Sequence, residues 1–125
     1  MVGALLDTSI LIDLLRRFTP AMTWFTGQNE LGASSIVWLE LLQGARNALA
    51  QQKAQQLLVQ LEKVKITDDD MNWAIKQLIQ YNLSHNVGGV DCLIASTSYR
   101  LQIPLYIMNL KHFAPILGTL AQKPY

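Results

Sequence analysis

The sequence predicts an α/β fold, a three-layer α/β/α sandwich with a mostly parallel central sheet. Short apolar runs that end at polar residues alternate with longer segments in which apolar residues recur at helical spacing. Such an alternation of strands and helices packs as right-handed crossovers between parallel strands. A length of 125 residues suits one such domain, so we expect a single domain over residues 1–125.

Each expected strand is a short apolar run bounded by polar residues, proline or glycine. In chain order, these strands cover residues 2–6, 31–37, 64–66 and 105–108. The tail, residues 113–125, is expected to hold a short turn and an edge strand.

Helices are expected where apolar residues recur three or four positions apart. They begin near Ile10, at Pro20 and at Trp38, and cover residues 51–63 and 90–101. Another helix begins at residues 67–70, one threonine and three aspartates. Pro20 suits the first turn of a helix, where its missing N–H needs no partner. Thr67 is a cap, and the aspartates after it place negative charge at the positive end of the helix dipole.

The composition indicates an ordered protein without a membrane span. Half of the residues are hydrophobic and 15% are charged, which is too apolar for a disordered chain. Asp7 and Asp13 interrupt the apolar N-terminus, and no basic region precedes it, so neither a span nor a signal peptide is expected. Cys92 is the single cysteine and permits no internal disulfide. We expect a cytoplasmic protein, and the net charge of +1 does not indicate a partner.

Two acidic residues lie where a parallel α/β fold binds its ligands. In such sheets, ligands bind beyond the carboxyl ends of the strands. Asp7 ends the first expected strand, although it can also cap the helix that follows. Asp91 begins a helix after two glycines, where a role at the helix dipole is the alternative.

Glu40 is harder to explain by structure alone. Apolar residues precede and follow it at 36–39 and 41–42, so its helix has little polar face. Glutamate is rarely buried without a partner or a metal, and the alternative is one exposed stripe on an apolar helix. Carboxylates that share a pocket repel one another, and Mg²⁺ or Mn²⁺ commonly stabilises them together. Such an ion can polarise a phosphoryl oxygen and activate water.

The segments around these residues resemble PIN domains, especially VapC-type toxins of bacterial toxin–antitoxin pairs. Residues 5–13, LLDTSILID, resemble the opening of the family. Residues 34–44, SSIVWLELLQG, resemble the second motif of the family, and residues 89–95, GVDCLIA, resemble the third. Residues 108–113, MNLKHF, resemble the segment after the fourth strand. Each motif is short, but their order and spacing match nearly the whole chain.

The resemblance implies a Mg²⁺- or Mn²⁺-dependent endoribonuclease that hydrolyses RNA phosphodiester bonds and acts as the toxin of a toxin–antitoxin pair. It implies that Asp7 and Asp91 are metal ligands and that Glu40 is a ligand or a base acting through metal-bound water. Asn109 stands where many members have a further aspartate. Its amide keeps an oxygen ligand but loses a charge, so a second metal would bind less tightly.

Four further residues are candidates for contact with RNA. Thr8 and Ser9 are expected to hydrogen-bond Asp7 or a substrate phosphate, with helix capping as an equal alternative. Arg16 and Lys111 offer positive charge to RNA phosphates, and a solvated surface position is the simpler alternative for both.

The resemblance also implies a homodimer and a small antitoxin that covers the acidic pocket. Trp24, Phe25, Trp38 and Leu42 are candidates for these apolar surfaces, with packing in the core as the alternative. Asp13 lies six residues beyond Asp7 and is expected to point away from the pocket, at the surface or in a salt bridge.

Two other functions compete with the nuclease. A PIN-like module that no longer cleaves and serves in binding or assembly is favoured mildly by Asn109 and by the nearly neutral net charge. In a receiver or a haloacid-dehalogenase-like phosphatase, the protein's own strand-end aspartate would become phosphorylated. Such phosphatases carry an Asp-x-Asp pattern after the first strand, whereas here Asp7 is followed by Thr8 and Ser9.

Overall fold

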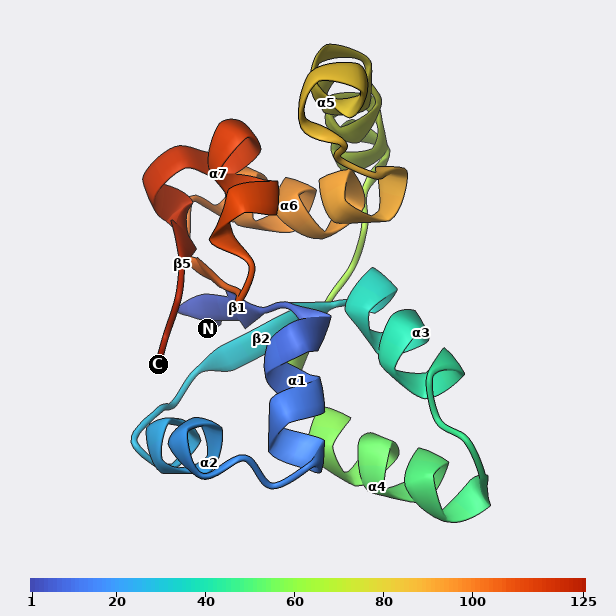
Figure 1. The fold of residues 1–125 in the computed structure, drawn as a ribbon, viewed down its shortest axis with the longest axis vertical. Coiled ribbons are helices and arrows are strands. Elements are labelled where there is room, and N and C mark those ends of the chain that lie inside the picture. The colour runs from blue at the N-terminus through green and yellow to red at the C-terminus, as the bar shows by residue number, and fades with distance from the viewer.

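The computed structural model describes residues 1–125 and contains one five-stranded sheet (Figure 1). The strands are β1 (Ala4–Leu6), β2 (Leu31–Ser34), β3 (Glu62–Val64), β4 (Leu105–Tyr106) and β5 (Ala121–Gln122). Their order across the sheet is β3-β2-β1-β4-β5, and every neighbouring pair is parallel. The predicted α/β/α fold is confirmed, with a sheet that is wholly parallel.

Seven α-helices cover the two faces of this sheet. One face carries α1 (Thr8–Leu15), α2 (Thr19–Thr26), α3 (Ser35–Gln43) and α4 (Ala48–Leu58) (Figure 1). The other face carries α5 (Asp68–His85), α6 (Gly89–Leu101) and α7 (Leu110–Leu117), which a short 3-10 turn, Gly118–Leu120, joins to β5. None of these helices combines the length and apolarity needed to cross a membrane.

The core lies on both sides of β1, the central strand. Leu5 and Leu6 are almost fully buried, because strands of a parallel sheet are covered on both faces and therefore read as continuous apolar runs. Ile10 of α1 and Ile94 of α6 pack in the same hydrophobic cluster. The four residues expected at apolar surfaces are only partly buried and pack against this cluster: Trp24, Phe25, Trp38 and Leu42.

The second strand is shorter than predicted, because a helix cap ends it early. β2 stops at Ser34, and the Ser34 hydroxyl accepts a hydrogen bond from the Val37 N–H at 3.4 Å. Ile36 and Val37 therefore lie in the first turn of α3, although β-branched residues favour strands. A side-chain cap that satisfies free N–H groups outweighs this preference here.

Several other boundaries also move by a few residues, and those of α4 and β3 are linked. Asn47 caps α4 through the Ala50 N–H at 2.8 Å, so this helix begins earlier and ends earlier than residues 51–63. The third strand correspondingly covers Glu62–Val64 instead of residues 64–66. The predicted cap at Thr67 is confirmed as a capping box with Asp70, and the predicted edge strand of the tail is β5. The short turn expected before this strand is Gly118–Leu120, and the helix α7 that precedes it, which begins at Leu110, was not predicted.

Candidate functional site

The sequence-predicted acids gather at the point where the strand order of the sheet reverses. From β1 the chain proceeds to β2 and β3 on one side, and later to β4 and β5 on the other. Asp7 directly follows β1, Glu40 lies in the helix that follows β2, and Asn109 follows β4. Such a switch point, at the carboxyl ends of parallel strands, is where open α/β sheets bind ligands.

Asp7 is held as the N-cap of α1. Its Oδ2 accepts the Ser9 backbone N–H at 2.9 Å, and only 8% of the residue is exposed. Burial raises the pKa of Asp7, hydrogen bonding from Ser9 lowers it, and the negative charge of Asp91 raises it again, with a net upward shift. Asp7 therefore has the capping role and also carries an unfavourable charge at the switch point.

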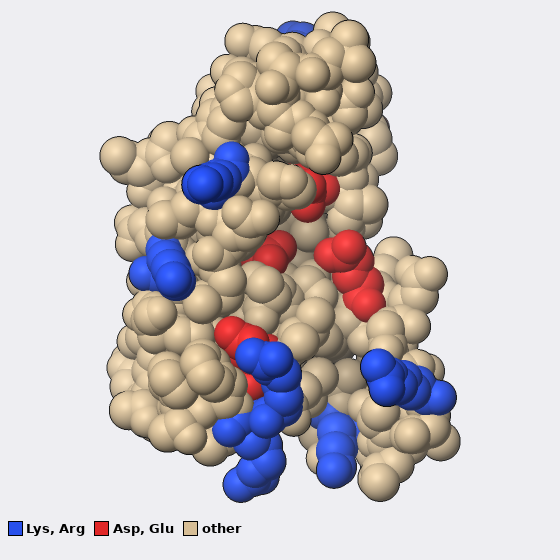
Figure 2. Space-filling view, in the orientation of Figure 1, with Lys and Arg blue, Asp and Glu red and all other residues tan.

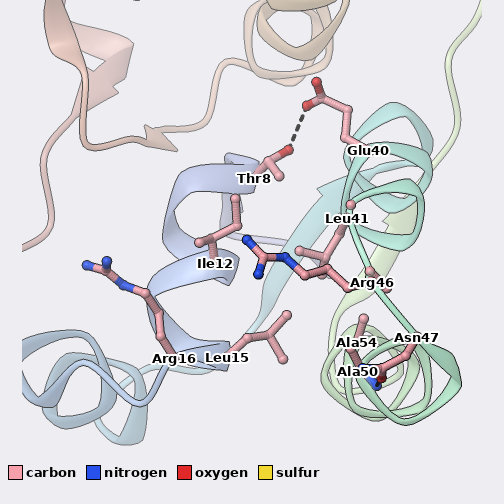
Figure 3. A pocket seen from close by; sticks show the side chains of 12 residues that line it. Thr8, Ile12, Leu15, Arg16, Glu40, Leu41, Arg46, Asn47, Ala50 and Ala54 are labelled. Carbon is pink, nitrogen blue, oxygen red and sulfur yellow. Dashed lines mark hydrogen bonds between the residues drawn. The ribbon is translucent and has the colours of Figure 1, made fainter.

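Glu40 is fixed by Thr8 across the space between α1 and α3. The Thr8 hydroxyl donates a hydrogen bond to Glu40 Oε1 at 2.7 Å (Figure 3). The sequence predicted a bond from Thr8 to Asp7 or to a phosphate, whereas the hydroxyl points at the second acid. This contact, between residues 32 positions apart, leaves no trace in local sequence patterns.

Asp91 lies in the first turn of α6 and contacts His112 of α7. The Gly88 N–H donates to Asp91 Oδ2 at 3.4 Å, as expected of a carboxylate at a helix start. His112 Nδ1 lies 3.2 Å from the same Oδ2, and the two side chains are 38% and 28% exposed, respectively. Sequence reasoning did not pair these residues.

The ends of β1 and β4 are joined next to the acids. The Ser9 hydroxyl accepts a hydrogen bond from the Met108 N–H at 3.3 Å. Asn109, the next residue, is the exposed N-cap position of α7, and its side chain makes no capping hydrogen bond. Its amide oxygen is therefore free for another partner.

The donor chemistry of this site fits a hard divalent cation. Asp7, Glu40, Asp91 and Asn109 all offer oxygen atoms, the ligands that Mg²⁺ prefers. As they stand, no three His, Cys, Asp or Glu side chains lie close enough to hold one ion, so binding would have to draw them together. The unfavourable charge of Asp91 at Asp7 is what a cation would relieve.

A cavity of about 450 Å³ adjoins the acids between α1, α3 and α4. Thr8 and Glu40 line one end of it, and Ile12 and Leu41 contribute to its apolar wall (Figure 3). Arg16 and Arg46 also line the cavity, and the guanidinium group of Arg46 makes no hydrogen bond or salt bridge. Figure 2 shows acidic side chains in the middle of this face, with lysine and arginine around them over α4, α7 and the far end of α1.

Asp13 is in a salt bridge, as expected, but it is not at the surface. Only 9% of the residue is exposed, because Asp13 Oδ2 accepts the Tyr125 hydroxyl at 2.8 Å. Burial and this hydrogen bond raise the pKa of Tyr125. Asp13 Oδ1 lies 3.1 Å from Arg16, whose side chain is 64% exposed. Lys111 is exposed as well.

Comparisons with known proteins identify a family. The family model of the PIN domain matches residues 4–108. No curated protein sequence matches the chain. Among solved structures, a chain of a toxin–antitoxin complex from Klebsiella pneumoniae is 25% identical, with a TM-score of 0.82 and 98% of both chains covered.

Two further structures share the fold at lower identity. A DNA-bound VapBC complex from Salmonella typhimurium is 20% identical, with a TM-score of 0.79 and 100% of both chains covered. A Mycobacterium tuberculosis VapC toxin, described as cleaving the sarcin–ricin loop, is 17% identical with a TM-score of 0.75, over 90% of this chain and 95% of that one. The chain therefore belongs to the PIN domain family, and its structural neighbours are VapC toxins of toxin–antitoxin complexes.

Proposed function

We propose that this chain is a metal-dependent endoribonuclease that hydrolyses RNA phosphodiester bonds, and that it is the toxin of a toxin–antitoxin pair. The main support is Asp7, a carboxylate buried at the switch point of a PIN fold, with its pKa raised by burial and by Asp91. Two carboxylates that repel each other in a partly buried site weaken the fold unless a cation stabilises them. A catalytic role explains why such a site exists.

The cation, Mg²⁺ or Mn²⁺, would be held by Asp7 and Asp91, with Glu40 and Asn109 as further oxygen ligands. PIN domains generally bind a divalent metal. When bound, the ion lowers the pKa of water and polarises a phosphoryl oxygen. Burial and the negative charge of Asp91 raise the pKa of Asp7, and a bound cation would act in the opposite direction by stabilising the ionised carboxylate.

The remaining chemistry falls to residues that hold or move protons. Thr8 occupies Glu40 Oε1, which leaves Oε2 to accept a proton from the attacking water. The Ser9 N–H keeps Asp7 in place, and the Ser9 hydroxyl keeps the segment before Asn109 against α1. Thr8 and Ser9 thus hold the acids in position in the absence of substrate.

Basic residues around the acids would bind the RNA backbone. Arg16 and Lys111 are exposed, and the salt bridge to Asp13 holds Arg16 beside the cavity. Phosphate contacts from arginine and lysine supply most of the sequence-independent affinity for nucleic acids. These two residues therefore orient the strand without selecting its sequence.

The partner of the toxin would be a small antitoxin that occupies the cavity beside Glu40. Aliphatic side chains line this cavity, and the unpaired guanidinium of Arg46 suits a carboxylate of the partner. A segment bound there would cover Thr8 and Glu40, and so block the acids. Structural neighbours of this chain come from such toxin–antitoxin complexes.

The decisive experiment compares RNA cleavage by the wild type and by two carboxylate-to-amide variants. A mixed RNA pool is incubated with Mg²⁺, with Mn²⁺ or with EDTA. We expect cutting only with a metal, and a loss of at least about 100-fold in Asp7→Asn and Asp91→Asn, since each removes a charged ligand. The matched control is Asp68→Asn, the same chemical change at an exposed position in the first turn of α5.

Two outcomes would overturn the proposal. No cutting with either metal by a folded wild type would favour the alternative of a binding or assembly module. Cutting that persists in EDTA, or that survives both substitutions, would place the chemistry elsewhere in the chain.

A further inference from the structure

We propose that His112 supplies a nitrogen ligand to the divalent cation held by Asp91, and that this ligand makes the site select Mn²⁺ over Mg²⁺. The inference rests on the proposed function, because it requires a cation at the acids. Its basis is the contact between His112 Nδ1 and Asp91 Oδ2, two metal-ligating atoms brought together from α7 and α6.

The spacing of these two atoms is that of neighbouring ligands. With bonds of about 2.1 Å, adjacent ligands of an octahedral ion lie about 3.0 Å apart. The observed separation of 3.2 Å is close to this value before any metal is present. An ion could therefore bind between them with little movement of either side chain.

The surroundings provide a route for the ion, and Asn109 is the proposed third ligand. Both side chains are partly exposed, at 38% for His112 and 28% for Asp91, so an ion can reach them from solvent. The His112 N–H donates to the Asn109 carbonyl oxygen at 3.3 Å in the first turn of α7, which keeps the two residues at the same helix end. The Asn109 side chain makes no capping hydrogen bond, so its amide oxygen remains the proposed third ligand.

A simple ion pair is the competing explanation for the contact. A partly exposed histidine and aspartate attract each other weakly, and such a pair adds little to stability. In that case, His112 would stay hydrogen-bonded to Asp91 when the ion binds, and only oxygen atoms would reach the metal. The two explanations therefore differ in the atoms bound to the ion.

The chemistry of imidazole sets the metal preference. Mg²⁺ takes oxygen ligands almost exclusively and gives up its water reluctantly. Affinity for a site with nitrogen donors rises from Mn²⁺ through the later first-row metals. His112 would thus add a neutral donor that Mn²⁺ accepts more readily than Mg²⁺ does.

Pulsed EPR of bound Mn²⁺ tests this directly, because a coordinated imidazole gives ¹⁴N modulation of the echo. The full chain is loaded with Mn²⁺, and free Mn²⁺ is counted by continuous-wave EPR to obtain Kd. The chain has two histidines, and the other, His85, is exposed at the end of α5 beside Ser84. His85→Gln is therefore the matched control for His112→Gln.

We expect ¹⁴N modulation in the wild type and in His85→Gln, and its loss in His112→Gln. The Kd for Mn²⁺ should rise about tenfold or more in His112→Gln, whereas the Kd for Mg²⁺, obtained by competition, should change much less. If His112→Gln fails to fold, ¹⁵N-histidine is incorporated into His85→Gln instead. The ¹⁴N modulation should then be replaced by ¹⁵N coupling from the one remaining histidine.

The failures of the two proposals are distinguishable. Mn²⁺ that binds the wild type and is lost in Asp91→Asn, but shows no histidine coupling, overturns the role of His112 and leaves the nuclease proposal standing. Persistent ¹⁴N modulation after ¹⁵N-histidine labelling also overturns it. A folded wild type that binds Mg²⁺ but no Mn²⁺ overturns the role of His112 alone, and one that binds neither ion overturns both proposals.

Discussion

At the scale of single residues, the contacts of the acids matter as much as the acids themselves. The sequence predicted Asp7, Glu40 and Asp91 as one site, from their places after strands and at helix starts. It could not predict that the Thr8 hydroxyl bonds Glu40, or that His112 meets Asp91, because these partners are 32 and 21 positions apart. Only the tertiary fold decides which polar side chains face each other.

Thr8→Val should impair catalysis while leaving substrate binding nearly intact. Valine keeps the shape of threonine but cannot donate a hydrogen bond, so Glu40 would lose its orientation. We expect kcat for RNA cleavage to fall roughly 10- to 100-fold with little change in KM, as is typical when a group that orients an active-site residue is removed. Steady-state cleavage at saturating metal measures both constants.

The conservative variant Thr8→Ser is the control, since serine retains the hydroxyl. It should recover most of the wild-type kcat. Equal losses in the valine and serine variants would show that the methyl group of Thr8, and not its hydrogen bond to Glu40, is what the reaction needs.

At the scale of elements, an ion pair between buried Asp70 and the more exposed Arg100 fastens α5 to α6. Arg100 Nε donates to Asp70 Oδ1 at 2.9 Å and to Oδ2 at 3.1 Å, and Arg100 Nη2 donates to the Lys65 carbonyl oxygen at 3.0 Å. The rings of Trp73 and Tyr99 stack between the same two helices at 4.7 Å. Because α6 carries Asp91, this fastening also positions the site.

Asp70→Asn should destabilise the protein in a pH-dependent manner. Burial alone would raise the pKa of Asp70, but hydrogen bonds from Arg100 and Thr67 and the charge of Arg100 hold it below 3.8. The ion pair therefore stabilises the fold above that pH, and its contribution is lost as the pH falls through the lower pKa of the folded state. We expect the variant to lose about 2 kcal/mol of unfolding free energy at neutral pH.

Urea unfolding at neutral pH and at about pH 3 measures this loss. The difference in unfolding free energy between the variant and the wild type should be smaller in acid. Asp69→Asn, an exposed neighbour in the same helical turn, should be nearly neutral. A loss of the same size at both pH values would contradict a charge-dependent role for Asp70.

Element boundaries show what the sequence could and could not predict. Apolar runs predicted the first four strands and the edge strand, because strands buried on both faces of a parallel sheet read as continuous apolar runs. The end of β2 was wrong by three residues, since the cap at Ser34 competes with the strand preference of Ile36 and Val37. Propensity alone does not decide such a contest.

At the scale of the whole molecule, α5 carries a row of exposed apolar side chains, whereas Trp24, Phe25, Trp38 and Leu42 are partly buried against the core. Four apolar residues follow one another at four-residue spacing along this helix: Met71, Ile75, Ile79 and Leu83. We call them the α5 ridge. Ile79 is 78% exposed and Leu83 is 97% exposed. Lys76 is the only Asp, Glu, Lys or Arg between Met71 and Gly89, so two copies could meet here without repulsion.

Ile79→Glu and Leu83→Glu should therefore shift the proposed homodimer to monomer. A charge buried in an apolar contact is costly, and the symmetry of a dimer would place two of them close together. Light scattering after gel filtration should give the mass of two chains for the wild type and of one chain for the variants.

Gln80→Glu introduces the same charge at a polar position of the same helix, and it should remain dimeric. A wild type that is monomeric at every concentration, or a control that dissociates as readily as the ridge variants, would exclude the α5 ridge as the dimer contact.

The pairing of β1 with β4 has a consequence for synthesis in the cell. Leu5 pairs with Leu105, so the middle of the sheet closes between segments a hundred positions apart. Asp7, Thr8 and Glu40 can gather once β2 and α3 have left the ribosome, but Asp91 and Asn109 join them only after the segments around residues 91 and 109 have emerged. Contacts so distant in sequence form late in folding. The proposed nuclease site would therefore stay incomplete until the segment around Asn109 has emerged, and the proposed antitoxin would have no complete site to cover before then.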